Sequence, residues 1–319
     1  MKKYPVFYPA LFMAICWLFF AQCKKNKNTP ECAVPAVVPY QPYSDPVWHP
    51  NGQLLGFNHT PQTGVYAQGT PPCTWYMNFV NQDSTGFYLM NKDGTGFRRV
   101  TSFHLGSPSW SPDGHWIAFS EGPAIYKMHF DGYTFDTTHI VQLTDSGANY
   151  FPCWTANSDT IYFDSNLGTN GQGYYVWKMA ADGSGQQGIP NTGREPYVGS
   201  NNKIYYMGLH DEVFSMNKDG SDKIQLTFNG NINNTSSNKS LPKYFNGNIY
   251  YQQIGIWLFI NGSPMQLNSA CETYDISING EIVYSKWDYS VSTSDKQRGC
   301  LWIMNADGSN NRQLTFNNN

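Results

Sequence analysis

Histidine, cysteine and acidic side chains could do chemistry in this chain, but their spacing matches no familiar catalytic motif. None of the seven histidines stands in a His-Glu-x-x-His pattern, and no two cysteines are spaced Cys-x-x-Cys. The common sequence signatures of a zinc site are therefore missing. No Gly-x-Ser-x-Gly turn offers a serine nucleophile. The acidic residues are scattered, without a pair that the sequence can assign as general acid and base. We expect no enzyme, no cofactor and no metal.

Cys23 is the cysteine whose surroundings suggest a modification. The first residues are basic (Lys2 and Lys3), and 6–20 is an apolar run too short for a comfortable membrane span. A cysteine directly after such a run resembles the lipobox of bacterial lipoproteins, which implies that Cys23 is lipidated and becomes the mature N-terminus. An uncleaved anchor or an ordinary signal peptide remains the alternative. We expect 1–22 to be a signal peptide and 23–44, which is rich in proline, to be a tether in the bacterial cell envelope.

The other cysteines suggest structure rather than catalysis, because export permits disulfides. Cys271 and Cys300 open the first and third strands of one predicted repeat, and Cys32 and Cys73 lie in the tether and in a long insertion. These four allow three pairings; we favour Cys271–Cys300 and Cys32–Cys73. Cys153 falls within a core strand and is expected to be a buried thiol.

Composition indicates an all-β protein without a nucleic-acid surface. Lys and Arg total 20 against 23 Asp and Glu, a formal net charge of −3, so no basic stripe can follow a phosphate backbone. Charged residues make up only 13% of the chain and aromatic residues 16%, with 29 glycines. This balance favours strands joined by tight turns.

A loose repeat then sets the architecture. Asp-Gly, or once Asn-Gly, recurs six times at intervals of 37 to 51 residues. The pairs are Asp93-Gly94, Asp131-Gly132, Asp182-Gly183, Asp219-Gly220, Asn261-Gly262 and Asp307-Gly308. Each follows an alternating apolar stretch and precedes a second short one, as in a hairpin with a tight turn that needs a positive φ. A further hairpin precedes each of these. Four strands in each of six repeats predict a six-bladed β-propeller over 45–319.

The clearest repeat is Pro108-Ser109-Trp110-Ser111-Pro112-Asp113-Gly114, followed by Ile125-Tyr126-Lys127-Met128 and Gln142-Leu143-Thr144. It resembles the WD40-like (PD40) repeat of TolB-type propellers, although the α/β domain of TolB itself has no room here. The aromatic residue at the third position of each inner strand and the methionines at 90, 128, 179, 216 and 304 are expected to be core. A lyase family of pectin oligomers shares this type of repeat and holds a metal with histidines. His59, His104 and His210 could reach one face, so a metal-dependent polysaccharide lyase remains an alternative.

Strand order then separates two faces of the predicted propeller. One face should carry only short turns. The other should receive the long insertions at 58–86, 164–174 and 285–299 and the crossover at 229–240. Because loops on a rigid scaffold commonly carry function, we expect this face to bind a protein or glycan of the cell envelope. The candidate contacts are the aromatic residues of two insertions that meet where the ring closes: Tyr66, Trp75, Tyr76, Phe79, Trp287 and Tyr289. A structural envelope protein without a specific ligand is the remaining alternative.

Overall fold

A computed structural model describes residues 43–68, 75–169, 173–228, 239–286 and 299–316, without the side chains of 62–79. The chain divides into two compact units. One comprises Ala36–Val65 and Asn78–Asn319, and the other comprises Met1–Pro35 and Tyr66–Met77. All blades belong to the first unit.

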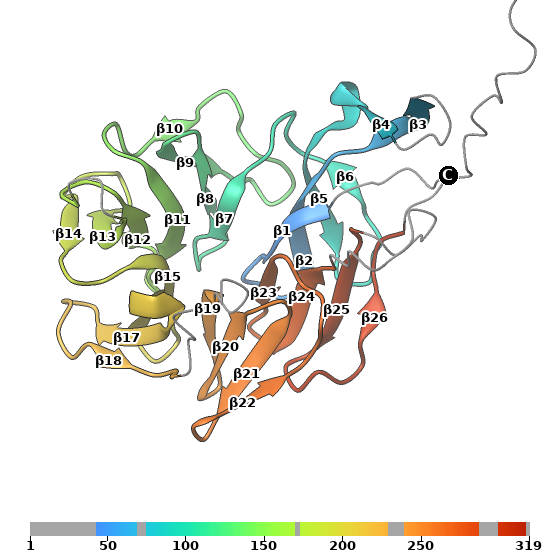
Figure 1. The fold of residues 1–319 in the computed structure, drawn as a ribbon. Helices are drawn as coiled ribbons and strands as arrows, with labels where there is room; N and C mark the ends of the chain where they lie inside the picture. Colours follow the sequence, from blue (N-terminus) through green and yellow to red (C-terminus); the bar gives the residue numbers. More distant parts are fainter. Residues whose placement is uncertain (1–42, 69–74, 170–172, 229–238, 287–298, 317–319) are drawn as a thin grey trace, which may run out of the picture. The chain divides into compact units, whose positions relative to one another are not determined.

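The first unit is a propeller of six four-stranded antiparallel sheets, as the sequence predicts (Figure 1). Blade one comprises β1 (Tyr43–Trp48), β2 (Leu54–His59), β5 (Gly86–Asn91) and β6 (Arg98–Arg99). Blade two comprises β7 (Gly106–Trp110), β8 (Trp116–Glu121), β9 (Ala124–His129) and β10 (Val141–Gln142). Blade three comprises β11 (Asn149–Trp154), β12 (Thr160–Ser165), β13 (Tyr175–Ala180) and β14 (Gln187–Ile189).

The remaining three blades repeat this arrangement toward the C-terminus. Blade four comprises β15 (Arg194–Val198), β16 (Lys203–Met207), β17 (Val213–Asn217) and β18 (Ile224–Gln225). Blade five comprises β19 (Ser240–Phe245), β20 (Asn248–Gln252), β21 (Ile256–Ile260) and β22 (Ser263–Gln266). Blade six comprises β23 (Tyr274–Ile276), β24 (Glu281–Ser285), β25 (Leu301–Asn305) and β26 (Arg312–Gln313). The six inner strands are neighbours in the order β1, β7, β11, β15, β19 and β23, and β23 returns to β1.

The Asp-Gly pairs close the outer hairpins, but mostly through a different turn from the primed type that the sequence suggested. At Asp93-Gly94 only the glycine has positive φ (91°), and the Asn91 N–H donates to the Thr95 carbonyl across a three-residue loop. The Asp93 carboxylate accepts from the Thr95 N–H at 2.9 Å, which explains the Asp-Gly-Ser/Thr pattern. Only Asn261-Gly262 has positive φ at both residues, as a type I′ turn requires.

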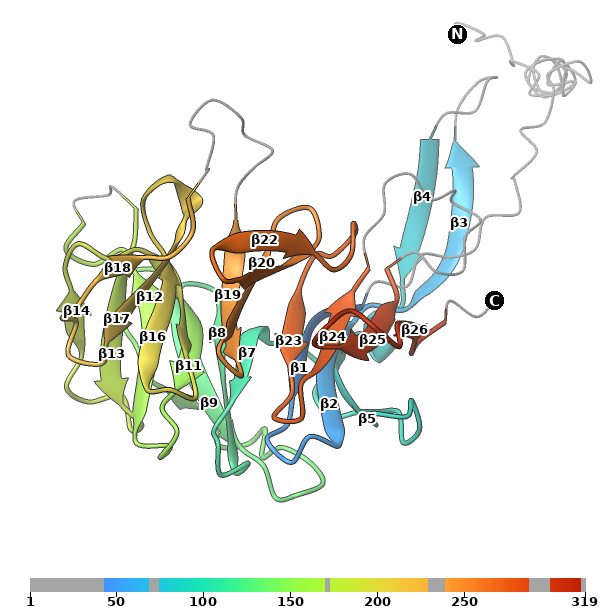
Figure 2. The ribbon, with the colours of Figure 1, turned by 90° about the horizontal axis from the view of Figure 1, so that it is seen from below.

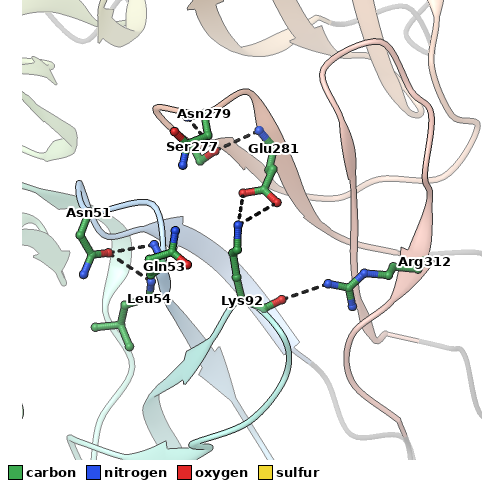
Figure 3. Close-up of polar contacts among 8 residues, drawn as sticks. All are labelled: Asn51, Gln53, Leu54, Lys92, Ser277, Asn279, Glu281 and Arg312. Atoms are coloured by element: carbon green, nitrogen blue, oxygen red, sulfur yellow. Dashed lines mark hydrogen bonds and ion pairs between the residues drawn. The ribbon is translucent and has the colours of Figure 1, made fainter.

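No described strand of the N-terminal segment joins blade six, so ring closure between blades one and six rests on side-chain contacts and on a hydrogen bond from the Tyr43 N–H to the Gly299 carbonyl at 3.1 Å. Figure 3 shows the polar part of this contact: Lys92 Nζ lies 3.2 Å from Glu281 Oε2, and Arg312 donates to the Lys92 carbonyl. Apolar side chains of both blades form one cluster beneath it, including the fully buried Leu55 and Leu301. The closure is therefore a packed core with a polar border.

The predicted core positions are confirmed for three tryptophans and for the methionines. Trp48, Trp110 and Trp154, the last residues of β1, β7 and β11, are buried, and so are the five methionines named from the repeat, whereas Tyr244 of blade five is only partly buried. These side chains fill the wedges between neighbouring blades, where close packing needs large apolar groups.

Two faces follow from this topology. We call the ends that carry the first-to-second and third-to-fourth strand turns the short-turn face, and the opposite ends the long-loop face. In Figure 2 the β1–β2 and β23–β24 turns lie at the lower side, on the short-turn face. The 58–86 insertion contains a hairpin of its own, β3 (Gln62–Gln68) with β4 (Trp75–Val80), followed by the short η1 helix (Gln82–Ser84). The expectation of only short turns on the short-turn face is wrong in blade two. There a longer connection joins β9 to β10 and folds back through a bridge between Phe130 and Phe135.

Candidate binding site in the central cavity and on the long-loop face

The six inner strands enclose a central cavity of about 490 Å³. Its walls run from residues near the start of these strands, such as Asp45, to residues beyond their last, such as Pro50 and Ile278. Backbone, proline and aromatic surfaces make up most of the wall, with a few charged groups. A concave site of this size with few convergent polar groups is typical of ligand binding.

Five of the inner strands contain the same irregularity near the long-loop face. In each, a non-glycine residue with positive φ precedes a proline, and the register of the strand shifts there. The pairs are Asp45-Pro46, Ser107-Pro108, Phe151-Pro152, Glu195-Pro196 and Leu241-Pro242. A left-handed residue before proline is sterically costly, and such strain concentrates at functional sites. All five pairs line the cavity.

Two carboxylates of the cavity wall have cations beside them. Glu195 accepts from the Arg194 guanidinium and from the Leu241 N–H, which donates to its Oε2 at 2.6 Å. Asp275 lies 3.1 Å from the Lys243 ammonium and accepts from the Trp48 N–H at 2.8 Å. These contacts also tie neighbouring blades together.

Two other carboxylates, those of Asp45 and Glu272, lie where the ring closes, and fewer contacts stabilise their charge. Asp45 Oδ2 accepts from two neutral donors, Ser44 Oγ and Asn58 Nδ2, each at 3.0 Å. Burial raises the pKa of Asp45, and burial followed by the Asp45 charge raises the pKa of Glu272. Among the described residues, neither carboxylate takes part in an ion pair. Asp45 lines the cavity, so this end of the cavity carries a buried carboxyl whose raised pKa favours the neutral form.

Asp164 is a buried acid in the wall between blades three and four. Its Oδ2 accepts from the Glu195 N–H at 2.9 Å, while its Oδ1 has no partner within the described chain. Burial raises the pKa of this carboxyl to about 8, although the Arg194 guanidinium lowers it. The structure therefore favours a protonated Asp164 at neutral pH.

The β16–β17 connection on the long-loop face is strained and firmly anchored. His210 and Asp211 are consecutive residues with positive φ (58° and 53°). Asp211 Oδ1 lies 2.8 Å from Arg194 Nη2, and the next residue, Glu212, forms a buried ion pair with Lys239 at 3.0 Å. The adjacent Leu209 is 76% exposed. Anchored loops that present apolar side chains favour partner binding.

Two more apolar side chains stand exposed at the long-loop ends of blades four and five. Phe228 is 60% exposed just after β18, and Ile254 is 63% exposed between β20 and β21. The sequence analysis missed both, because a single apolar residue in a polar connection is not part of any repeating pattern.

The predicted aromatic contacts stay predictions. Tyr66, Trp75, Tyr76 and Phe79 lie in β3 and β4, whose side chains are not described, and Trp287 and Tyr289 lie outside the described residues. The lipidation site Cys23 also lies outside them, as does the segment 1–22.

The three histidines expected on the long-loop face do not converge. His104 Nε2 lies 3.3 Å from the carbonyl of His59 and 3.1 Å from Thr60 Oγ1, whereas His210 belongs to blade four. In the described ranges no group of three His, Cys, Asp or Glu side chains could hold a metal ion.

The structure describes only two of the four cysteines that were expected to pair. Cys32 and Cys73 lie outside the described residues. Cys271 and Cys300 are both buried but form no disulfide with one another, so the favoured bridge is not confirmed. Cys271 belongs to the cluster between blades five and six, whereas Cys300 adjoins Tyr43 of blade one. The two thiols thus lie toward different neighbours of the sixth blade.

No family model and no curated protein matches this sequence. Solved structures do match it. One is described as TolB from Agrobacterium tumefaciens, with a TM-score of 0.53 at 15% identity over 72% of this chain and 84% of that one. Another is TolB from Acinetobacter baumannii, with a TM-score of 0.53 at 13% identity over 84% of this chain and 77% of that one.

Oligogalacturonate lyase from Vibrio parahaemolyticus also matches, with a TM-score of 0.49 at 10% identity over 88% of this chain and 79% of that one. This likeness is too weak to support an argument about activity. The TolB matches show that the fold is that of TolB-like six-bladed propellers.

Proposed function

We propose that this chain is a binding protein of the cell envelope, which holds a protein partner on the long-loop face of its propeller. One observation carries the proposal. The residues that open the strained inner strands, the anchored β16–β17 loop and the hairpin insertion all belong to the same face. The proposal assigns the chain no catalytic step.

The surface of this face supports a protein partner. Leu209, Phe228 and Ile254 expose apolar surface, and Asp211 and Glu212 are neutralised by ion pairs within the fold. Partly apolar patches on rigid elements are the usual centre of a protein interface.

The structure allows a clean deletion to test this proposal. The Asn81 N–H donates to the Pro61 carbonyl at 2.8 Å, so the two ends of the hairpin insertion lie side by side. Replacing 62–80 by a short Gly-Ser link should leave the blades folded, because the free energy of loop closure changes slowly with loop length.

We expect the trimmed protein to keep its melting temperature within a few degrees and to lose partner capture from detergent-solubilised envelope. The matched control is Asp219→Asn on the short-turn face, which should leave capture unchanged. A folded, trimmed protein that captures the same partner at full strength would refute a binding role for the insertion.

We also propose that the protein is exported and anchored through lipid on Cys23. The support is the short apolar run with a cysteine directly after it. In the described ranges no helix is long and apolar enough to cross a membrane. Cys23→Ser should move the protein to the soluble exported fraction or leave the precursor uncleaved. Normal processing with unchanged membrane retention would contradict the lipid anchor.

A further inference from the structure

His49 joins blades one and two at the short-turn end of the central cavity. It follows β1 directly and lines the cavity wall. Its ring packs edge-on against Trp110, with centroids 4.7 Å apart, and lies 5.8 Å from the ring of Phe130. A Cβ at Gly114 would come within 2.8 Å of His49 Nε2, so a glycine there makes room for the ring. His49 therefore fills the seam between two blades.

Both ring nitrogens of His49 are engaged, and the partners fix which of them carries the proton. The Asn51 N–H lies 3.2 Å from Nδ1, and the Gly114 carbonyl lies 3.3 Å from Nε2. A backbone N–H can only donate, so Nδ1 must accept and Nε2 must carry the hydrogen. This pair of bonds requires the neutral ring.

The groups that face His49 do not favour its charged form. His115, from the turn between β7 and β8, is the titratable neighbour, and a positive charge on it would repel one on His49. Trp110 and Phe130 are neutral, and no carboxylate in the described part of the chain pairs with the ring. Burial lowers the pKa of His49 below its ordinary value of 6.5, and a positive charge on His115 lowers it further.

We propose that His49 is an acid-sensitive contact between blades one and two. Protonation places a second N–H against the Asn51 N–H and breaks that bond. The turn that follows β1 and the seam at the short-turn end of the cavity then loosen. This inference does not depend on the identity of the partner or on binding at the long-loop face.

The direction of the pH dependence follows from the bonds. A histidine held neutral contributes stability that is fully present above the unfolded pKa of about 6.5 and is lost as the pH falls through the lower folded value. Acid should therefore weaken this seam, and neutral pH should restore it.

Nuclear magnetic resonance on the intact propeller can follow this change. We expect the His49 ring to titrate below the ordinary histidine value of about 6.5, and the amide signals of Asn51 and Gly114 to shift with the His49 midpoint. The amide of Gly185, in an open turn of blade three, should not follow it. A His49 midpoint at or above about 6.5, or unmoved Asn51 and Gly114 amides, would overturn the proposal.

His49→Gln provides a second test, because glutamine can accept from Asn51 and donate to Gly114 without titrating. Between pH 7.5 and 5.0 the folding equilibrium constant of the wild-type protein should fall relative to this variant, by at most about thirtyfold. An identical loss in wild type and His49→Gln would also overturn the proposal.

Discussion

Asp164→Asn should make the protein more stable at neutral pH than the wild type. The wild-type carboxyl has a pKa of about 8 when folded, against 3.8 as its ordinary value, because burial penalises its charged form. Folding at pH 7 therefore requires Asp164 to bind a proton that the unfolded chain has released. Asparagine needs no proton, and its side-chain oxygen can still accept from the Glu195 N–H.

The magnitude follows from proton linkage. A raised folded pKa gives stability that is present below the unfolded value and lost as the pH rises toward the folded value. The loss is at most about 1.4 kcal/mol per pH unit, or roughly 4 kcal/mol between pH 4 and 7. The unpaired amide hydrogens of asparagine carry a cost of about 1–3 kcal/mol that does not depend on pH. The change with pH in the stability difference between variant and wild type is therefore more informative than the size of that difference at one pH.

Urea unfolding at pH 4, 5, 6, 7 and 8 measures this slope. We expect the free energy of unfolding of Asp164→Asn to rise relative to the wild type by at least about 2 kcal/mol from pH 4 to 7. The exposed Asp145→Asn, from the neighbouring connection, should run parallel to the wild type. Parallel profiles for Asp164→Asn and wild type would refute the assignment of a neutral, buried Asp164.

Three further outcomes are expected. Lys239→Met leaves Glu212 buried without its cation and should lower the free energy of unfolding by about 3–5 kcal/mol. The double variant Glu212→Gln/Lys239→Met should recover most of this loss. An equal loss in the single and the double variant would exclude coupling between the two side chains. Leu301→Ala, at a fully buried site where the ring closes, should cost about 2–5 kcal/mol in a denaturant titration, and a cost under about 1 kcal/mol would contradict tight packing there. Alkylation of the unfolded, unreduced protein should label both Cys271 and Cys300 as thiols, and recovery of their peptides joined would restore the disulfide.

The repeat made the fold predictable, because each level of the sequence points to the same structure. Asp219-Gly220 marks a turn, the alternation in 213–216 marks a strand, and the recurrence of both marks a propeller. The wedge-filling role of Trp110 follows from its repeated position. Turns, strands and wedge-filling residues of this kind depend on the local sequence and on its repetition, and both can be seen in a single sequence.

The candidate site was less predictable, because it depends on contacts between blades. The X-Pro openings of the inner strands were visible, but nothing local in Asp45-Pro46 predicts a left-handed aspartate whose N–H donates to Thr273, more than 200 residues away. The raised pKa of Asp164 and the ion pair of Glu212 likewise arise only when separate blades meet. The Cys271–Cys300 bridge is not confirmed for the same reason, since proximity along a blade does not reveal which neighbour each thiol faces.

Site-specific photo-crosslinking in cells tests the central claim most directly. A photoreactive residue would replace Leu209 or Ile254 on the long-loop face, and Tyr133 or Ile278 on the short-turn face, all of them exposed side chains. Binding on the long-loop face predicts one crosslinked protein of the same size from both Leu209 and Ile254, and none from Tyr133 or Ile278. Crosslinks that form only from the short-turn positions would contradict the account.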